Sequence, residues 1–392
     1  MKLAFVVQRY GAGIAGGSEA HCRQIAERLG ALHEITVLTT CARDYVTWEN
    51  RFPAGEAMED GVRVLRFPVA RPRRLKRFAD LSDEVFAGGT SPELQEEWFR
   101  ENGPDTPALL AHLREHGREY DLVIFWTFRY SPSYFGLPLV ADRAVLAPTA
   151  EEDPAIDLQV LRDFFQIPAG YLFLTPEEEE LVSQRAGRAP RPAAVIGSGL
   201  DEAPMAPPLD VLDKLEIPRR FLLYLGRVDR NKGCEALLDS FQEYLDGGGD
   251  STLVLAGPAT LRVPDHPRIR ALGYVDDAVR EALLAHARML LVPSPYESLS
   301  IVLLEAWNHG VPALVNAHCR VLEGQVRRAN GGLCYRSTRE FIEGLDYLLR
   351  HEDHRAAFGR QGLQYVEREY RWPTVLARIN TLLTDVRSRR SI

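Results

Sequence analysis

The fold is decided by a stretch in the second half of the chain, which reads FLLYLGRVDRNKG from Phe221 to Gly233. Its first five residues form an unbroken apolar run, which is typical of a strand buried inside a parallel sheet. Gly226 and Arg227 predict a turn after this strand, and Lys232 stands at the start of the next helix. A strand, a glycine–arginine turn and a lysine at a helix start together favour binding of a diphosphate. We call residues Gly226–Gly233 the cationic turn.

A second motif lies further along the chain and reads PSPYESLSIVLLEAW from Pro293 to Trp307. It places Glu297 in a serine-rich turn and Glu305 on the apolar helix that follows. The first N–H groups of a helix have no partner within the helix, so those of Ser298-Leu299-Ser300 can receive phosphate. Together with the cationic turn, this motif indicates a nucleotide-sugar site.

Length and composition narrow the class of protein. The chain has 392 residues, which is enough for two domains. Its formal net charge of -8 argues against a nucleic-acid partner. Five cysteines without CxxC spacing indicate neither a zinc ribbon nor a disulfide framework, and a reducing compartment fits them best. No stretch reaches the ~20 apolar residues of a membrane span. We therefore expect a cytoplasmic protein that contacts a membrane at most peripherally.

Short apolar runs alternate with helical patterns, which predicts parallel βαβ units in an α/β protein with doubly wound sheets. Helix starts are indicated by Ser18, by Thr175 with Pro176 and Glu178 after it, and by Asp276. The strands expected from the apolar runs are Leu3–Val7, Ile35–Leu38, Val62–Leu65, Leu122–Phe125, Ala144–Ala147, Tyr171–Leu174, Phe221–Leu225, Leu253–Ala256, Met289–Val292 and Ala313–Val315.

The pattern restarts after Asp201–Pro218, a proline-rich stretch that we interpret as a linker. We expect two Rossmann-like domains, residues 1–200 and 201–372, facing a cleft, because ligands bind at the carboxyl ends of such strands. The last helices are interrupted at Arg371-Trp372-Pro373. Residues 373–392 are therefore expected to form a separate terminal helix.

The order and spacing of these motifs resemble those of the retaining GT-B glycosyltransferases of family 4. Gly16-Gly17-Ser18, the VIGSGLD run at residues 195–201 and Gly273-Tyr274-Val275 support the resemblance, which extends over nearly the whole chain. It implies an enzyme that moves a hexose from a nucleotide-diphosphate sugar to a hydroxyl of a glycan, a lipid-linked molecule or a small molecule. It also implies polysaccharide or glycoconjugate synthesis, and a terminal helix that returns to the N-terminal domain after Pro373.

The resemblance also assigns roles to the two motifs. Arg227 and Lys232 would bind the donor's diphosphate, with Gly226 in the same turn. Glu305 would hold the ribose hydroxyls, and Glu297 would lie beside the transferred sugar. No Asp-x-Asp doublet accompanies these residues, and their cations make a metal unnecessary. We expect metal-independent catalysis with no cofactor besides the nucleotide sugar.

The remaining donor contacts are expected from backbone. By the same resemblance, Gly16-Gly17 would lie over the phosphates and the sugar, and the backbone near Val275 would meet the base. Family members usually have a histidine after the strand that corresponds to Ala144–Ala147, where it hydrogen-bonds the donor sugar. This chain has Glu151 at that place. An ionised carboxylate accepts hydrogen bonds but cannot donate them, so the polar pattern of the donor sugar would differ.

Two other functions are left open by the residues. Glu297 and Glu305 are compatible with the acid/base pair of a glycoside hydrolase, although the cationic turn favours a phosphate leaving group. A protein that binds a nucleotide sugar without transferring it is a second alternative, supported by the missing histidine. His112 and His116 match an H-x-x-E-H zinc signature, but a solvated helix face is the better interpretation because no third ligand is evident.

Two segments of the N-terminal half are candidates for acceptor or partner contacts. The basic run Arg71–Phe78 is compatible with anionic lipid or a polyprenyl-diphosphate acceptor, and equally with a solvated loop. Aromatic residues follow the strand at Leu122–Phe125 and either stack on a sugar or fill the core. Among the residues after that strand, we favour Arg129 and Tyr130 for acceptor contact.

Overall fold

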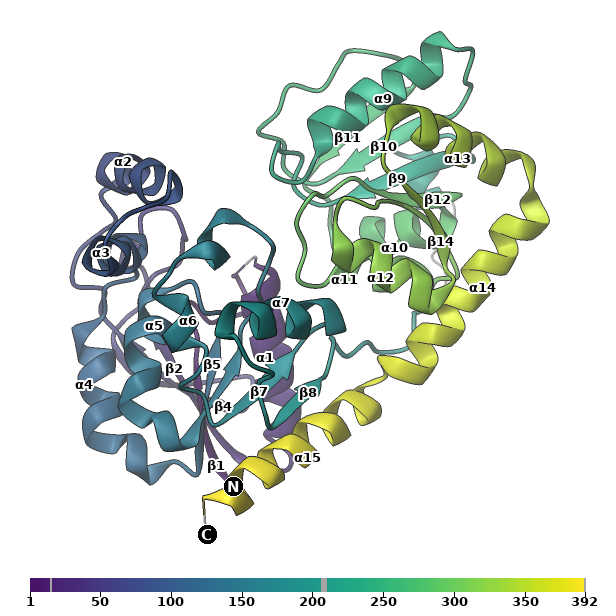
Figure 1. Ribbon diagram of the computed structural model, residues 1–392. Helices are drawn as coiled ribbons and strands as arrows, with labels where there is room; N and C mark the ends of the chain where they lie inside the picture. Colours follow the sequence, from purple (N-terminus) through teal and green to yellow (C-terminus); the bar gives the residue numbers. More distant parts are fainter. Residues whose placement is uncertain (15, 206–209, 391–392) are drawn as a thin grey trace. The chain divides into compact units, whose positions relative to one another are not determined.

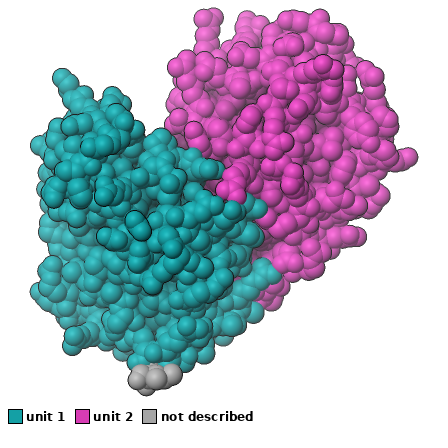
Figure 2. All heavy atoms as spheres, in the orientation of Figure 1, with its two compact units in different colours: residues 1–198, 376–392 teal, residues 199–375 magenta. Residues whose placement is uncertain are grey.

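A computed structural model describes residues 1–14, 16–205 and 210–390, and these residues divide into two compact units (Figure 2). The first unit contains Met1–Ser198 together with Leu376–Ile392, and the second contains Gly199–Val375. Each unit is built on one sheet with helices packed around it (Figure 1). Pro207 and Pro208 of the expected linker lie outside the described residues.

The first unit holds an eight-stranded sheet in the order β3-β4-β2-β1-β5-β6-β7-β8. All neighbouring strands run parallel except β3, which is antiparallel to β4. Every residue of β5 is buried, so both faces of the sheet are covered, as in a doubly wound fold. The strands are β1 (Lys2–Val6), β2 (Glu34–Thr40), β3 (Gly55–Glu59), β4 (Val62–Phe67), β5 (Leu122–Trp126), β6 (Ala144–Ala147), β7 (Gly170–Phe173) and β8 (Ala193–Val195).

The helices of the first unit begin and end at well-defined residues. They are α1 (Gly17–Leu29), α2 (Leu75–Phe86), α3 (Pro92–Asn102), α4 (Pro107–His116), α5 (Ser131–Gly136), α6 (Leu161–Phe164) and α7 (Pro176–Ala186), with 3₁₀ helices at Gly117–Glu119, Leu137–Arg143 and Pro154–Asp157.

The predicted cap of α7 is confirmed, because the Thr175 side chain accepts a hydrogen bond from the backbone N–H of Glu178. The predicted cap at Ser18 is wrong. Helix α1 begins two residues earlier, with Gly16 at its N-cap, and the Ser18 hydroxyl donates to the Glu19 carboxylate instead.

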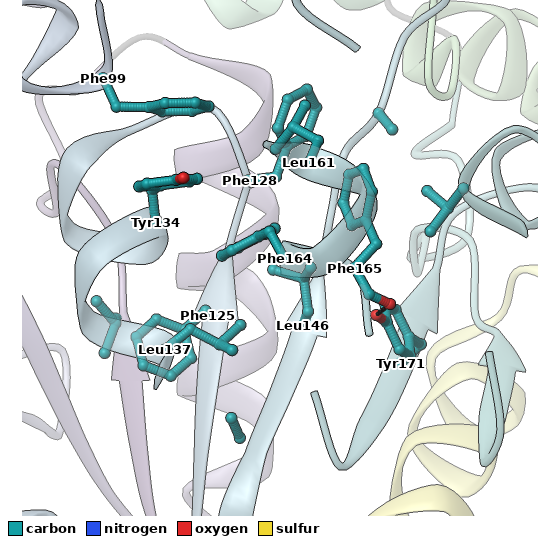
Figure 3. Close-up of a cluster of buried hydrophobic side chains, with 14 of the residues drawn as sticks. Phe99, Phe125, Phe128, Tyr134, Leu137, Leu146, Leu161, Phe164, Phe165 and Tyr171 are labelled. Atoms are coloured by element: carbon teal, nitrogen blue, oxygen red, sulfur yellow. Dashed lines mark hydrogen bonds between the residues drawn. The ribbon is translucent and has the colours of Figure 1, made fainter. Parts of the chain in front are cut away.

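An aromatic cluster fills the space between the first sheet and α3, α5 and α6 (Figure 3). Phe99 stacks on Tyr134 with ring centroids 4.0 Å apart, and Phe164 stacks on the other side at 5.3 Å. Phe128 is 1% exposed and packs edge-on against Phe165. These rings form core, which settles the interpretation of Phe128 and Tyr134 in favour of packing.

The second unit holds a six-stranded, all-parallel sheet in the order β11-β10-β9-β12-β13-β14. Its strands are β9 (Phe221–Leu225), β10 (Thr252–Ala256), β11 (Ile269–Gly273), β12 (Met289–Val292), β13 (Ala313–Asn316) and β14 (Gly332–Tyr335). Its helices are α8 (Asp210–Asp213), α9 (Cys234–Asp246), α10 (Asp277–His286), α11 (Ile301–Asn308), α12 (Arg320–Ala329), α13 (Thr338–Arg350) and α14 (Glu352–Glu369).

Trp307 anchors α11 in the second unit. Its indole is fully buried, and its N–H donates to the Gly331 carbonyl at 2.8 Å. A Cβ atom at Gly331 or Gly362 would lie within about 2.5 Å of the indole ring, so only glycine leaves room for it. This contact fixes the helix that carries Glu305 against α14.

Helix α14 ends at Glu369, and the last helix, α15, covers Trp372–Arg389. The break between them lies at the interruption that the sequence predicts. From Leu376 onward the chain belongs to the first unit. Asn380 Oδ1 lies 2.6 Å from His33 Nε2, and Val386 packs against Gly170. In Figure 1 the end of this helix lies near the N-terminus of the chain. The described ranges contain no helix with both the length and the apolarity of a membrane span.

Candidate functional site

The cationic turn follows β9 directly, at the carboxyl end of the second sheet. Buried Asp229 organises it: Oδ1 accepts the backbone N–H of Lys232 at 2.8 Å, and Oδ2 lies 3.6 Å from Arg227 Nη1. The Arg227 side chain is half exposed, at 51%. Gly226 has a φ of +146°, a conformation that residues with a Cβ rarely adopt. The turn therefore holds both cations at the surface where a ligand can reach them.

The cationic turn and the two-glutamate motif meet in the structure. Gly233 has a φ of +71°, and a Cβ there would lie 2.3 Å from the Pro293 carbonyl oxygen at the end of β12. This close approach brings Lys232 Nζ within 2.8 Å of Glu297 Oε1. Sequence spacing favours a common site for these residues, but it does not predict their ion pair.

The segment after Glu297 leads into α11. Ser300 is the N-cap residue and is buried, and its backbone N–H donates to Gln325 Oε1 at 3.1 Å. The expectation that this N–H is open to phosphate is therefore wrong for Ser300, because Gln325 of α12 already occupies it. The donor-binding roles of Ser298 and Leu299 stay predictions.

Glu305 has a protein partner on another helix. Its Oε2 forms an ion pair with Arg280 of α10, and Arg280 Nη1 also lies 3.0 Å from Glu281 Oε1. Burial raises the pKa of the Glu305 carboxyl above its ordinary value, and the Arg280 guanidinium opposes that shift. His309 at the end of α11 completes the group, with Nε2 2.9 Å from Glu281 Oε2.

Val275 lies in the turn between β11 and α10. Asp276 caps α10 as predicted, accepting the backbone N–H of Val279 at 2.8 Å. Tyr274 is 84% exposed, so this turn is open to solvent. Helix α10 also carries Arg280, the ion-pair partner of Glu305. The turn that is expected near the base therefore leads directly into the helix that contacts Glu305.

In the first unit, the loop after β1 is organised by a buried ion pair. Arg9 Nε lies 2.9 Å from Glu19 Oε1, and both side chains are about 93% buried or more. A Cβ at Gly16 would lie 2.3 Å from Glu19 Oε2, whereas Gly17 has open space beside it. The ion pair therefore requires glycine at position 16 and fixes the backbone that we expect to approach the donor.

Strained backbone follows two neighbouring strands of the first sheet, β5 and β6. Thr127 after β5 has a φ of +58° and Thr149 after β6 has a φ of +47°. β-branched residues rarely adopt such values, and strain of this kind is found preferentially at functional sites. Both residues lie at the carboxyl ends of neighbouring parallel strands. The structure thereby marks this edge as a candidate site.

Arg129 and Tyr130 lie at this edge, and both are engaged by the protein. Arg129 forms an ion pair with Asp153, and its carbonyl accepts a hydrogen bond from Asn102 at 3.0 Å. Tyr130 packs edge-on against Trp48, with centroids 5.3 Å apart. An acceptor role for Arg129 and Tyr130 stays a prediction.

Glu178 supports the segment that carries Glu151. It is 1% exposed, and its carboxylate accepts the backbone N–H groups of Ala150 at 2.7 Å and Leu174 at 2.6 Å. Burial raises the pKa of Glu178 to about 8 despite these hydrogen bonds. The sequence indicates Glu178 only as part of a helix cap. Its reach to Ala150 depends on the order β6-β7 in the sheet, which the cap motif does not encode.

His21 of α1 is a second residue that the sequence did not single out. It is fully buried, and burial lowers its pKa to about 4, so the ring is neutral. Trp126 Nε1 donates to His21 Nδ1 at 3.3 Å, which leaves the proton on Nε2 for the Gly197 carbonyl at 3.0 Å. The helix after the glycine loop is thus fixed to the VIGSGLD run.

The basic run Arg71–Phe78 is largely paired within the first unit. Arg71 and Arg74 both contact Glu101, and Arg77 lies 2.6 Å from Glu97. The Arg73 guanidinium donates to the carbonyls of Tyr45 and Asn102 and lies over the Trp48 ring. These contacts favour a structural role for most of the run.

The H-x-x-E-H segment lies in α4. The rings of His112 and His116 are 4.8 Å apart, with His112 Nε2 3.1 Å from the Tyr120 hydroxyl and His116 Nδ1 2.8 Å from Glu119. Within residues 1–14, 16–205 and 210–390, no three histidine, cysteine or carboxylate side chains are placed to hold a metal ion.

Comparison with known sequences finds a family match within the second unit. Residues 219–351 match the family model described as Glycosyl transferases group 1. A GDP-mannose-dependent alpha-(1-6)-phosphatidylinositol dimannoside mannosyltransferase of Mycobacterium tuberculosis is 26% identical over 174 residues, 42% of this chain and 45% of its own. A glycogen synthase of Thermus thermophilus is 30% identical over 162 residues, 38% of this chain and 35% of its own. The chain therefore spans less than half the length of these curated relatives.

Solved structures extend the likeness to the whole fold. The sucrose-phosphate synthase of Thermosynechococcus elongatus superimposes with a TM-score of 0.73 at 16% identity, over 99% of each chain. The HepE protein of Anabaena, in complex with UDP and glucose, gives 0.72 at 17% identity, over 98% of this chain and all of that one. The protein thus has the GT-B fold, and its residues 219–351 match the model of the group 1 glycosyl transferases.

Proposed function

We propose that the protein is a retaining glycosyltransferase that moves a hexose from a nucleotide-diphosphate sugar to a hydroxyl acceptor. The observation that carries this proposal is the 2.8 Å contact between Lys232 Nζ and Glu297 Oε1. It joins a cation suited to the leaving diphosphate to a carboxylate suited to the sugar. An ammonium group has three N–H donors, so Lys232 can contact Glu297 and a phosphate at the same time.

The chemistry is a substitution at the anomeric carbon of the donor sugar. The bond from this carbon to the diphosphate oxygen breaks while the acceptor oxygen bonds to the same face, and the acceptor proton passes to the leaving phosphate. Negative charge grows on the diphosphate during this step. Arg227 and Lys232 stabilise that charge, and removal of either is expected to lower the rate by ~10²–10³. No protein nucleophile and no metal are needed for this route.

The other residues bind and orient the substrates. Glu305 accepts the ribose hydroxyls, and the backbone near Val275 meets the base. Glu151 accepts hydrogen bonds from hydroxyls of the donor sugar, and Glu178 holds its segment through the hydrogen bond from the Ala150 N–H. The Gly16-Gly17 backbone approaches the same sugar.

Acceptor contacts are proposed at the carboxyl edge of the first sheet, and they include Arg129 and Tyr130. The donor is proposed to be UDP-glucose or GDP-mannose. The similar mannosyltransferase is GDP-mannose-dependent, and the similar HepE structure is a complex with UDP-glucose. A peripheral contact of Arg71–Phe78 with anionic lipid stays a weaker proposal. Lipid phosphates would have to compete with Glu97 and Glu101 for the arginines. A cytoplasmic location likewise stays a prediction.

The test is a thermal-shift series with UDP, GDP, ADP, CDP and dTDP. A ligand at ~100 times its dissociation constant stabilises the protein by about 2.7 kcal/mol. A shift with one nucleotide that is lost in Arg227→Ala and Lys232→Ala supports the site. Arg339→Ala is the matched control, because Arg339 is an exposed cation of the same unit that pairs with Glu343 on its own helix. Absence of any shift with the unmodified protein would refute a nucleotide-sugar site.

A non-transferring nucleotide-sugar-binding protein is the second candidate, favoured by Glu151 where relatives usually have histidine. It is distinguished by incubating the protein with UDP-glucose and GDP-mannose and measuring release of the nucleoside diphosphate. Binding without release over many hours, with or without added sugar acceptors, would support this alternative. A glycosidase would instead cleave model glycosides without nucleotide, and Arg227→Ala would leave that activity largely unchanged.

A further inference from the structure

Arg280 is placed between two carboxylates on different helices. Its Nη2 contacts Glu305 Oε2 on α11, and its Nη1 lies 3.0 Å from Glu281 Oε1, the neighbouring residue on α10. Glu281 is held in turn by His309, whose Nε2 lies 2.9 Å from Glu281 Oε2 and whose side chain is 6% exposed. The guanidinium is thus fixed from one side and presented to Glu305 from a defined direction.

This arrangement matters because the backbone alone does not fix the orientation of the Glu305 carboxylate. Helix α11 fixes the Cα position through Trp307, but a glutamate side chain retains three rotatable bonds and several rotamers. The side chain is 21% exposed, so water can compete for its oxygens. Arg280 contacts the carboxylate through Oε2, so a ligand hydroxyl would be accepted by Oε1.

We propose that Arg280 is a positioning residue for ribose recognition, which holds the Glu305 carboxylate in the orientation that accepts hydrogen bonds from the donor's ribose hydroxyls. Arg280 thereby sets the preference for a ribonucleotide over its 2′-deoxy counterpart. The inference rests on the proposed function, because it requires a nucleotide in the second unit. A purely structural role would differ: the ion pair would join α10 to α11 and affect stability without affecting the choice between the two sugars.

Arg280 is suited to this role by its chemistry. A guanidinium presents several N–H donors in a rigid plane, so it can contact Glu281 and Glu305 at once in fixed directions. A lysine ammonium at the same place would retain the charge but not the planar geometry. Arg280→Lys is therefore expected to restore part of the ribose preference, and Arg280→Gln none of it.

The experiment is titration calorimetry with UDP, 2′-deoxy-UDP, GDP and 2′-deoxy-GDP on the unmodified protein and on Arg280→Gln, Arg280→Lys and Glu305→Gln. A hydrogen bond to a charged group corresponds to roughly a 10- to 100-fold change in affinity, so a ribose preference of that order is expected. Arg280→Gln should bring the preference to within about threefold of equality while affinity for the 2′-deoxy nucleotide stays nearly constant. Arg339→Gln serves as the control and should keep the full preference.

The outcomes separate the two proposals. An Arg280→Gln protein that is less stable but keeps the unmodified ribose preference overturns the positioning role and leaves the proposed function intact. Failure of the unmodified protein to bind any of the four nucleotides overturns both. If Arg280→Gln does not fold, Arg280→Lys decides the question: an undiminished preference in that variant counts against positioning, and an intermediate one supports it.

Discussion

Replacement of Glu178 by glutamine provides a sharp test of the electrostatics of the first unit. The carboxyl group is buried, and its pKa of about 8 stands well above the ordinary 4.5. Between these two values the unfolded chain is ionised while the folded protein keeps its proton. The folded state then binds more protons, so its stability falls as pH rises, by about 1.4 kcal/mol per pH unit. The full loss is about 5 kcal/mol, complete above a pH of about 8.

Glutamine has no titrating group, so this pH dependence disappears in Glu178→Gln. In the variant, the amide NH₂ group faces one of the two backbone N–H groups that the carboxylate accepts, those of Ala150 and Leu174. One hydrogen bond is lost because both groups are donors, and this loss is expected to cost about 1–3 kcal/mol of stability at every pH. The variant should therefore be less stable than the unmodified protein near pH 5 and more stable near pH 8. The difference in unfolding free energy should rise by about 1.4 kcal/mol per pH unit between them.

The assay is denaturant unfolding at pH 5, 6, 7 and 8, followed by tryptophan fluorescence. The signal comes from Trp48, Trp98 and Trp126 of the first unit and from Trp307 and Trp372 of the second, so the transition of the first unit is the one compared between variants. Glu180→Gln is the matched control, since Glu180 lies on the same helix but is exposed, and it should show no such trend. A difference that stays flat with pH would refute the reasoning. It would mean that the backbone N–H donors outweigh burial and keep the carboxylate ionised.

Three further predictions concern packing and backbone. Gly362→Ala forces a methyl group against the Trp307 indole and should destabilise the second unit by about 1–3 kcal/mol, measured by calorimetric unfolding; an unchanged melting temperature would contradict the close contact. Gly233→Ala places a Cβ at positive φ and 2.3 Å from the Pro293 carbonyl, so it should lower both stability and nucleotide affinity in titrations, whereas stability loss alone would argue against a binding role for the turn. Leu383→Ala removes a fully buried side chain of α15 and should cost about 2–5 kcal/mol, seen in the unfolding of the first unit and not of the second.

Strands with unbroken apolar runs could be predicted from the sequence almost to the residue. Phe221–Leu225 and Met289–Val292 form β9 and β12 with the expected bounds, because a strand covered on both faces needs apolar residues at every position. The four edge strands, β3, β8, β11 and β14, were missed. The residues of β3 are mostly exposed, and the segment GEAME contains no β-branched or aromatic residue, so nothing in its pattern separates a strand from a loop.

The parts of the candidate site that lie within one motif could also be predicted, whereas contacts between distant elements could not. The order of the cationic turn and the two glutamates indicates a shared site, since both follow strands of one parallel sheet. The ion pair of Arg280 with Glu305 depends on how α10 packs beside α11, which neither helix encodes alone. The hydrogen bond that Gln325 makes with Ser300 was missed for the same reason.

The return of α15 to the first unit has a consequence for the order in which the protein is made. Roughly 180 residues separate Ser198 from Leu376, which lie in the two segments of the first unit. At ~5–20 residues per second, Leu376 is therefore synthesised on the order of 10–40 s after Ser198. During that interval the surface that will bury Ile379, Leu383 and Val386 has no cover. Residues 1–198 are therefore synthesised before the second unit, but the first unit is completed only after the second unit has been translated.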